Sequence, residues 1–240
     1  MMASVPPPPP DDMKPSAGRL SEYFAEYPTK DLVNLLRQMG PPDDLYVDNQ
    51  RAHSEGRASY GDILISLHER ATKDVFDEAS ALCADPDPNQ RITGLWLLRE
   101  IGPTNHRPLY AETWSLLDRM AKAEQDVRVL RWVVMCFGFT YNPAALNPLV
   151  SFSTHPDPEI RESVAFHIAS CSETNDPRMV DVQRQLCGDE VTQVRRYAAY
   201  DFANGISADT PEIRRTLESL VNDEDEMVRE SAVEALASRH

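Results

Sequence analysis

Residues 157–165 read DPEIRESVA, and residues 225–236 read DEMVRESAVEAL. Each stretch has an aspartate four residues before an arginine and small or apolar residues three and four after it. Related stretches recur through the chain around Arg91, Arg128, Arg161, Arg195 and Arg229, at intervals of 37, 33, 34 and 34 residues. A fixed period in this range is typical of stacked supersecondary units, none of which buries its apolar face alone. The sequence therefore predicts a repeat array.

The apolar positions around each arginine predict a helix. Counted from the arginine, positions −1, +3, +4, +7 and +8 are mostly small or apolar, and at 100° per residue they share one helix face. Carboxylates lie four or six residues before most of the arginines, as Asp157 and Asp189 do. Such carboxylates are typical of the turn and N-cap that precede a helix.

A first helix is predicted before each of these second helices. Asn142-Pro143, Asp176-Pro177 and Thr210-Pro211 each place a capping side chain before a proline. Proline is favoured at the first helical position because its missing N–H would have no partner there. The predicted unit is therefore a helix, an acidic turn and a second helix.

This pattern resembles HEAT repeats, in particular the bacterial PBS-lyase HEAT-like type, over residues 69–240. The resemblance implies an all-α fold, an α-solenoid formed as a right-handed superhelix of antiparallel helix pairs, with about five HEAT-like repeats plus N-terminal helices. The sequence departs from the pattern at Val191 and before Arg128, where a distorted turn is expected. Members of this family serve mainly as protein-binding scaffolds, and smaller groups assist bilin attachment or bind nucleic acid.

The N-terminal part is predicted to differ from the array. Residues 1–18 contain five consecutive prolines, Pro6 to Pro10, and are expected to form an extended, disordered tail. Residues 19–68 are expected to form a helical capping region, with helices at 20–24, 29–39 and 60–67 and a loop at 41–58. Residues 69–240 then form one continuous array.

The charge balance favours some partners over others. The 240 residues include 24 Lys and Arg against 39 Asp and Glu, a formal net charge of −15. Nucleic-acid binding requires a basic surface, so a basic protein or peptide partner is favoured over DNA or RNA. We expect no membrane span, because no run of 18 apolar residues occurs, and no secretory signal, so the expected compartment is the cytoplasm.

Motifs for catalysis or ligand binding are absent from the sequence. The six histidines and four cysteines form no metal-ligand spacing, and the nine glycines form no phosphate-binding loop. We therefore expect no enzymatic activity, no metal and no cofactor. Cys83, Cys136, Cys171 and Cys187 are expected to be small buried hydrophobic residues.

The functional prediction rests on apolar residues opposite the predicted core face. Positions +2, +5 and +9 should be exposed, yet many carry large apolar or aromatic side chains, which are typical of binding surfaces. The predicted partner-binding residues are Trp96, Leu130, Val133, Phe137, Phe166, Tyr197, Tyr200 and Asn204. Asp201, His167, Arg99 and Glu100 would add a polar rim. The resemblance implies that the second helices line a concave groove.

Two interpretations of this stripe remain open. It binds a partner, or it is buried inside the molecule, for example against residues 19–67. The first makes the chain a protein-protein interaction scaffold or regulator; the alternatives are a bilin-lyase-like accessory subunit and a nucleic-acid-binding repeat protein. The pattern selects no particular partner or oligomeric state. The five repeat arginines are expected to be structural, forming an Asp–Arg ladder between adjacent repeats.

Overall fold

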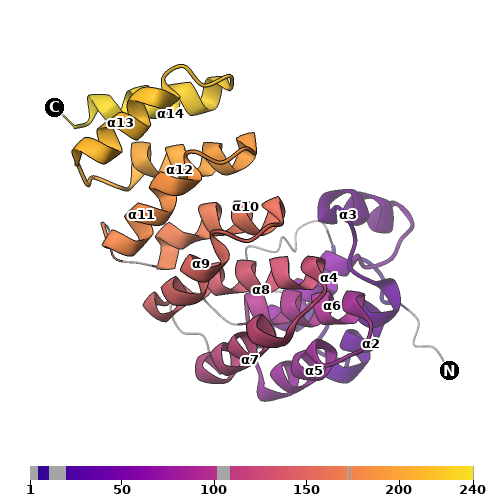
Figure 1. Ribbon diagram of the computed structural model, residues 1–240. Helices are drawn as coiled ribbons and strands as arrows, with labels where there is room; N and C mark the ends of the chain where they lie inside the picture. The colour runs from indigo at the N-terminus through magenta and orange to yellow at the C-terminus, as the bar shows by residue number, and fades with distance from the viewer. Residues whose placement is uncertain (1–4, 11–19, 102–108, 172, 174, 240) are drawn as a thin grey trace. The chain divides into compact units, whose positions relative to one another are not determined.

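The computed structural model describes residues 5–10, 20–101, 109–171, 173 and 175–239 (Figure 1). Every regular element in these residues is a helix, which confirms the predicted all-α repeat fold. The chain divides into two compact units, residues 1–120 and residues 121–240.

The N-terminal unit has its core between six helices. Their bounds are α1 (Leu20–Tyr23), α2 (Thr29–Met39), α3 (Leu45–Ser54), α4 (Tyr60–Arg70), α5 (Lys73–Cys83) and α6 (Pro88–Arg99). A further helix, α7 (Tyr110–Ala123), crosses the division between the units. Helix α5 pairs with α6, while α4 contacts α1, α2, α3 and α6. Helix α4 is therefore a central element of this unit rather than a cap with one polar face.

Two predictions for the N-terminal region are wrong. The predicted loop at 41–58 contains α3, which begins after Asp44, whose side chain accepts hydrogen bonds from the backbone N–H groups of Tyr46 and Val47. Part of the predicted disordered tail is ordered, because the N–H of Ala58 donates to the carbonyl oxygen of Pro6 at 2.8 Å. Pro6 is buried. Residues 1–4 and 11–18 of the predicted tail lie outside the described residues.

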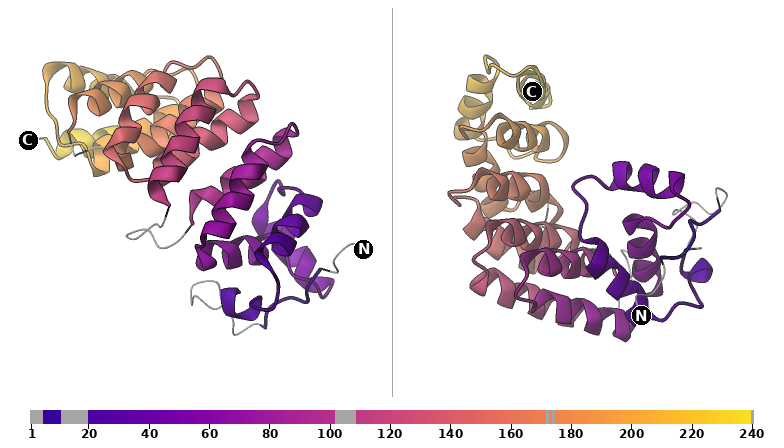
Figure 2. Two further views of the ribbon diagram at one scale, coloured as in Figure 1. Left: turned by 90° about the horizontal axis from the view of Figure 1, so that it is seen from below. Right: turned by 90° about the vertical axis from the view of Figure 1, so that its right-hand side faces the viewer.

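The C-terminal unit is a stack of helix pairs (Figure 1, Figure 2). Its elements are α8 (Val127–Phe139), the 3-10 helix η2 (Pro143–Ala145), α9 (Leu146–Phe152), α10 (Pro158–His167), the 3-10 helix η3 (Ile168–Cys171), α11 (Pro177–Leu186), α12 (Thr192–Asn204), α13 (Pro211–Leu220) and α14 (Glu226–Ala237). The second helices form one row, in which α8 contacts α10, α10 contacts α12, and α12 contacts α14. This row positions the candidate site.

The predicted capping side chains explain where these helices begin. Asn142, Asp176 and Thr210 each accept a hydrogen bond from a backbone N–H two or three residues ahead, and a proline follows each of them. Asp157 and Asp225 cap second helices in the same way. Helix α12 is the exception among them: its N-cap is Val191, which has no capping side chain.

The core of the C-terminal unit follows the predicted helix face. Around Arg195, the side chains of Val194, Ala198, Ala199 and Phe202 are buried. The four cysteines of the chain are all free and buried, as predicted. Apolar burial along this one face holds each second helix against its neighbours in the row.

Candidate functional site

Arg161 and Arg195 link consecutive turns of the C-terminal unit. The guanidinium of Arg161 donates to both carboxylate oxygens of Asp189, at 2.6 and 2.9 Å, and Arg195 does the same to Asp223, at 2.8 and 3.0 Å. Burial is the largest single effect and raises the pKa of both aspartates, but the arginine hydrogen bonds, a backbone hydrogen bond and the arginine charges together outweigh it, so the pKa of each aspartate is lowered. These pairs hold neighbouring repeats in register.

Each of these arginines also binds its own turn. Arg161 donates to the carbonyl oxygens of His155 and Pro156, which lie six and five residues earlier. Arg91 and Arg195 bind the equivalent pairs of carbonyl oxygens, and Arg229 binds the first of its pair. The arginine position thus ties the acidic turn to the second helix.

Arg128 is out of register with the other four arginines. The N-cap of α8 is Asp126, two residues before Arg128, whereas Asp87, Asp157 and Asp225 cap their helices four residues before the arginine. Arg128 consequently pairs with its own cap, Asp126, at 2.9 Å, and its side chain is 58% exposed. Counting from the cap moves the repeat position in α8 from Arg128 to Leu130. Where a distorted turn was predicted, the helix instead begins two residues later relative to the arginine than in the other repeats.

This shift corrects three of the predicted groove residues. Leu130, Val133 and Phe137 were expected to be exposed and are buried. In the frame set by Asp126, Val133 and Phe137 occupy positions +3 and +7, which face the core. The burial of these two residues therefore agrees with the repeat pattern once the positions in α8 are counted from Leu130.

Trp96 is also buried, contrary to the prediction, for a different reason. Its repeat is in register, but the ring of Tyr60 from α4 packs edge-on against the indole, with 5.5 Å between ring centroids. A nitrogen of the His68 ring lies 2.9 Å from the carbonyl oxygen of Trp96. The N-terminal helices therefore cover the stripe in this unit, as the internal-burial interpretation expects.

In the C-terminal unit the stripe reaches solvent. Phe166 is 54% exposed and Tyr200 is 57% exposed, while Tyr197 is half-buried and Asn204 is exposed. Phe166 and Tyr200 occupy position +5 of α10 and α12, and Tyr197 occupies position +2 of α12. These residues, apart from Asn204, line a groove.

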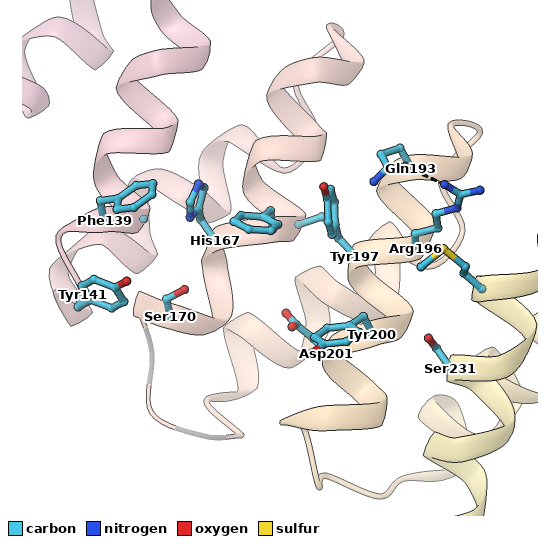
Figure 3. Close-up of a pocket in the computed structure, with 14 residues that line it drawn as sticks. Phe139, Tyr141, His167, Ser170, Gln193, Arg196, Tyr197, Tyr200, Asp201 and Ser231 are labelled. Carbon is cyan, nitrogen blue, oxygen red and sulfur yellow. Dashed lines mark hydrogen bonds between the residues drawn. The ribbon is translucent and has the colours of Figure 1, made fainter. Parts of the chain in front are cut away.

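The groove has a volume of about 710 Å³, and its walls come from α8, α10, α12 and α14 (Figure 3). Its lining comprises Gly138, Phe139, Tyr141, Ala165, Phe166, His167, Ser170, Gln193, Arg196, Tyr197, Tyr200, Asp201, Met227 and Ser231. The volume lies in the range of sites that bind small ligands or peptide side chains. Five of these fourteen residues are phenylalanine or tyrosine.

The aromatic rings form a connected series along the groove. The rings of Phe166 and Tyr197 meet edge-on with 4.9 Å between centroids, and Phe166 also meets His167 edge-on at 4.7 Å. His167 in turn lies 5.3 Å from Phe139. Edge-to-face contacts at these distances stabilise ring orientation. The groove therefore presents a preformed aromatic surface.

Asp201 supplies a carboxylate to this surface. Its side chain points toward the side of the groove where Ser170 lies (Figure 3). Burial raises the pKa of Asp201 to about 7, although a hydrogen bond from the Gln183 side chain opposes the shift. Gln183 is fully buried and also donates to the carbonyl oxygen of Ala165 at 2.8 Å, which fixes the position of Asp201 relative to α10.

The positive charge in the groove is already paired. Arg196 donates through Nε to Asp225 at 2.9 Å and through Nη2 at 2.5 Å, and it also contacts Gln193 at 3.2 Å. Since both carboxylate oxygens of Asp225 are engaged, Arg196 is held along the wall between α12 and α14. Its hydrogen bonds leave little capacity for an anionic ligand.

Several lining residues were not predicted. When positions in α8 are counted from Leu130, Phe139 is position +9, equivalent to Ser170 in the next repeat. The sequence signal for this correction is that Asp126 lies only two residues before Arg128. Met227 and Ser231 belong to α14 and line the groove because α14 packs against α12. Arg99 and Glu100, the other predicted rim residues, are the last residue and the C-cap of α6 in the N-terminal unit and do not line this groove.

Two further findings concern possible ligands and membranes. Among the residues that the structure describes, no group of three or more His, Cys, Asp and Glu side chains is arranged to hold a metal ion. Likewise, no helix in the described ranges is both long and apolar enough to cross a membrane.

Comparisons with known proteins show the fold. No protein-family model matches the sequence, and no curated protein matches it. Among solved structures, the Escherichia coli protein YibA is 19% identical, with a TM-score of 0.68 over 91% of this chain and 73% of YibA.

Two designed armadillo repeat proteins are also similar. One, solved in complex with the peptide (KR)4, is 17% identical, with a TM-score of 0.56 over 88% of this chain and all of the designed protein. The other, designed for modular peptide recognition, is 15% identical, with a TM-score of 0.53 over 82% of this chain and all of the designed protein. These similarities establish the helical-repeat architecture; the PBS-lyase HEAT-like type stays a prediction.

Proposed function

We propose that this protein is a non-enzymatic interaction scaffold that binds a basic protein or peptide segment in the groove of its C-terminal unit. The observation that carries the proposal is the exposure of Phe166 and Tyr200 beside Tyr197 in a cavity of about 710 Å³. Exposed aromatic residues that line a preformed concavity are typical anchors for a partner. The net charge of −15 favours a basic partner.

The structural neighbours support this proposal. Two of them are designed armadillo repeat proteins, one in complex with a basic peptide and one made for peptide recognition. This chain shares the helical-repeat architecture of these two designed proteins. The cytoplasm remains the compartment we propose, and the four buried free thiols are compatible with a reducing environment.

The test removes the anchors singly and together. Partners captured by the wild-type protein and identified by mass spectrometry are titrated against Phe166→Ala, Tyr200→Ala and the double variant. Each single substitution should weaken binding by more than about 1 kcal/mol because truncation removes a buried aromatic contact. Tyr46→Ala is the matched control: Tyr46 is 71% exposed, but it lies on α3 in the N-terminal unit.

The outcomes separate the functional classes. A double variant that binds its partner as tightly as the wild type contradicts the groove assignment. A tetrapyrrole ligand, which the family resemblance offers as an alternative, would instead give a visible absorbance band when the protein is mixed with bilin. Salt-sensitive binding to DNA or RNA would favour the nucleic-acid alternative.

A further inference from the structure

We propose that the groove accepts a lysine or arginine side chain of the bound polypeptide, with Asp201 as its counter-ion and Phe166, Tyr197 and Tyr200 as the aromatic walls around it. This inference rests on the proposed function and specifies the chemistry of its binding site. Three observations support it: Asp201 has no cationic partner among the described residues, aromatic rings line the groove, and the chain has a net negative charge.

Asp201 differs from three other aspartates of this unit whose side chains are buried or partly buried. Asp189, Asp223 and Asp225 are each paired with an arginine of the same unit. Within the described chain, Gln183 is the only hydrogen-bond donor to the Asp201 side chain, and no cation lies within ion-pair distance of it. A carboxylate has about four acceptor sites, so the hydrogen bond from Gln183 leaves most of its acceptor capacity unused. An unpaired, desolvated carboxylate is costly and favours a cationic ligand.

The charged and titratable groups on the helices around Asp201 do not provide this cation. On α12, Arg196 is engaged by Asp225, and Tyr197 and Tyr200 are phenols. On α11, Arg184 pairs with Asp181 at 3.7 Å, and Cys187 is a buried thiol whose pKa is raised to about 12 by burial and by Asp201. Helix α10 contributes His167, and α14 contributes Met227 and Ser231, with Glu234 further along the same helix. The site is therefore short of positive charge.

The aromatic walls suit a cationic side chain. Phe166 and Tyr197 are held edge-on at 4.9 Å, and Tyr200 is the residue next to Asp201. Lysine and arginine bind favourably over aromatic faces, and the interaction strengthens where water is excluded. The groove volume of about 710 Å³ accommodates such a side chain together with the backbone that carries it.

The charge of the whole chain selects the source of the cation. A net charge of −15 attracts basic polypeptides over long range, and the groove then binds one of their side chains specifically. An acidic peptide would place its carboxylates beside Asp201 and is disfavoured. Charge complementarity therefore favours a basic segment of a partner polypeptide as the ligand of this site.

The experiment uses the full chain and the peptide (Lys-Arg)4, with an octaglutamine peptide of the same length as the neutral probe. Binding is measured by fluorescence anisotropy for the wild type, Asp201→Asn and Glu218→Gln. The second variant is the matched control, because Glu218 is an exposed residue of α13 and its substitution removes the same charge. We expect Asp201→Asn to lose about tenfold in affinity for the basic peptide and Glu218→Gln to lose less than about twofold.

The pH dependence provides a readout that a general charge effect would not produce. Since the pKa of Asp201 is raised to about 7, the carboxylate ionises as pH rises through that value, and affinity should increase from about pH 6 to about pH 8. Asp201→Asn should show no such increase. Equal pH profiles for the wild type and the variant would overturn the inference.

A measurement without ligand checks that the substitution leaves the fold intact. A raised folded-state pKa stabilises the protein below the unfolded pKa of about 4, and this contribution is lost as pH rises through about 7. The midpoint of urea unfolding should therefore fall over this range more steeply in the wild type than in Asp201→Asn. The variant should be at least as stable as the wild type above pH 7.

The failures of the two proposals are distinguishable. If both peptides bind equally and Phe166→Ala weakens both, the scaffold function stands and the cation site is overturned. If neither peptide binds, and captured partners bind the Phe166 and Tyr200 variants as tightly as the wild type, both the groove assignment and the cation site are wrong. Binding of the basic peptide that is indifferent to Asp201→Asn also overturns the inference.

Discussion

Arg195 and Arg128 occupy the same place in the sequence pattern and different places in the structure. Arg195 is 9% exposed, and its guanidinium joins Asp223 of the following turn to two carbonyl oxygens of its own turn. Arg128 is largely exposed and pairs with Asp126, two residues earlier. Removal of a buried arginine that links two repeats leaves its partner's charge buried and unpaired, whereas an exposed local pair contributes little to stability.

This contrast predicts a difference in stability. Arg195→Ala leaves the Asp223 carboxylate without its partner and should lower the free energy of unfolding by about 3 to 5 kcal/mol. Arg128→Ala should change it by no more than about 1 kcal/mol. Urea unfolding followed by circular dichroism measures both, and equal effects for the two variants would refute the assignment of the inter-repeat link.

At the scale of elements, two glycines set how closely helices approach. A Cβ atom added at Gly94 of α6 would lie 2.7 Å from the carbonyl oxygen of Ala79 and 2.9 Å from the backbone nitrogen of Cys83, both on α5. At Gly138 of α8 it would lie 2.2 Å from the ring of His167 on α10. The contact at Gly94 is with backbone, which cannot rotate away, so α5 and α6 pack at this distance because the residue is glycine.

We predict that Gly94→Ala destabilises the protein. Alanine improves helix propensity by about 1 kcal/mol, but the clash with α5 should outweigh this gain and give a net loss of about 1 to 3 kcal/mol. Gly188→Ala is the control, because its added Cβ would meet only the Gln185 carbonyl oxygen, at 3.4 Å. Thermal unfolding of the two variants measures the difference; a gain in stability for Gly94→Ala would show that the helix pair can separate without cost.

At the scale of the whole molecule, charge governs encounter with a partner. The net charge of −15 produces a field that attracts basic segments, and salt screens this field over a distance of about 10 Å at about 0.1 M. The contacts within the groove are shorter and partly desolvated, so salt affects them less.

This separation of ranges predicts the kinetics. Raising the salt concentration from about 50 mM to about 500 mM should slow association with a basic partner by tenfold or more and change dissociation far less. Stopped-flow mixing or surface plasmon resonance measures both rate constants. A dissociation rate that carries most of the salt dependence would mean that screened surface charges, rather than the groove, hold the partner.

The sequence determined the repeat architecture because the signals for it are local. Caps such as Asp157 before Pro158 fix where helices begin, and the apolar face counted from Arg161 or Arg195 predicts which side chains are buried. The same local signals gave a wrong prediction at α8. Arg128 fits the spacing of the repeat arginines, but the N-cap Asp126 lies two residues before it instead of four.

Only the tertiary structure decided which part of the predicted stripe is open. Trp96 and Phe166 occupy the same repeat position, yet Tyr60 of α4 covers Trp96, while Phe166 remains exposed beside Tyr197. Likewise, Asp201 acquires its raised pKa from burial between helices, while a hydrogen bond from Gln183, a residue 18 positions earlier in the chain, opposes the shift. Periodicity assigns a residue to a face of its own helix, whereas exposure depends on what other elements pack against that face.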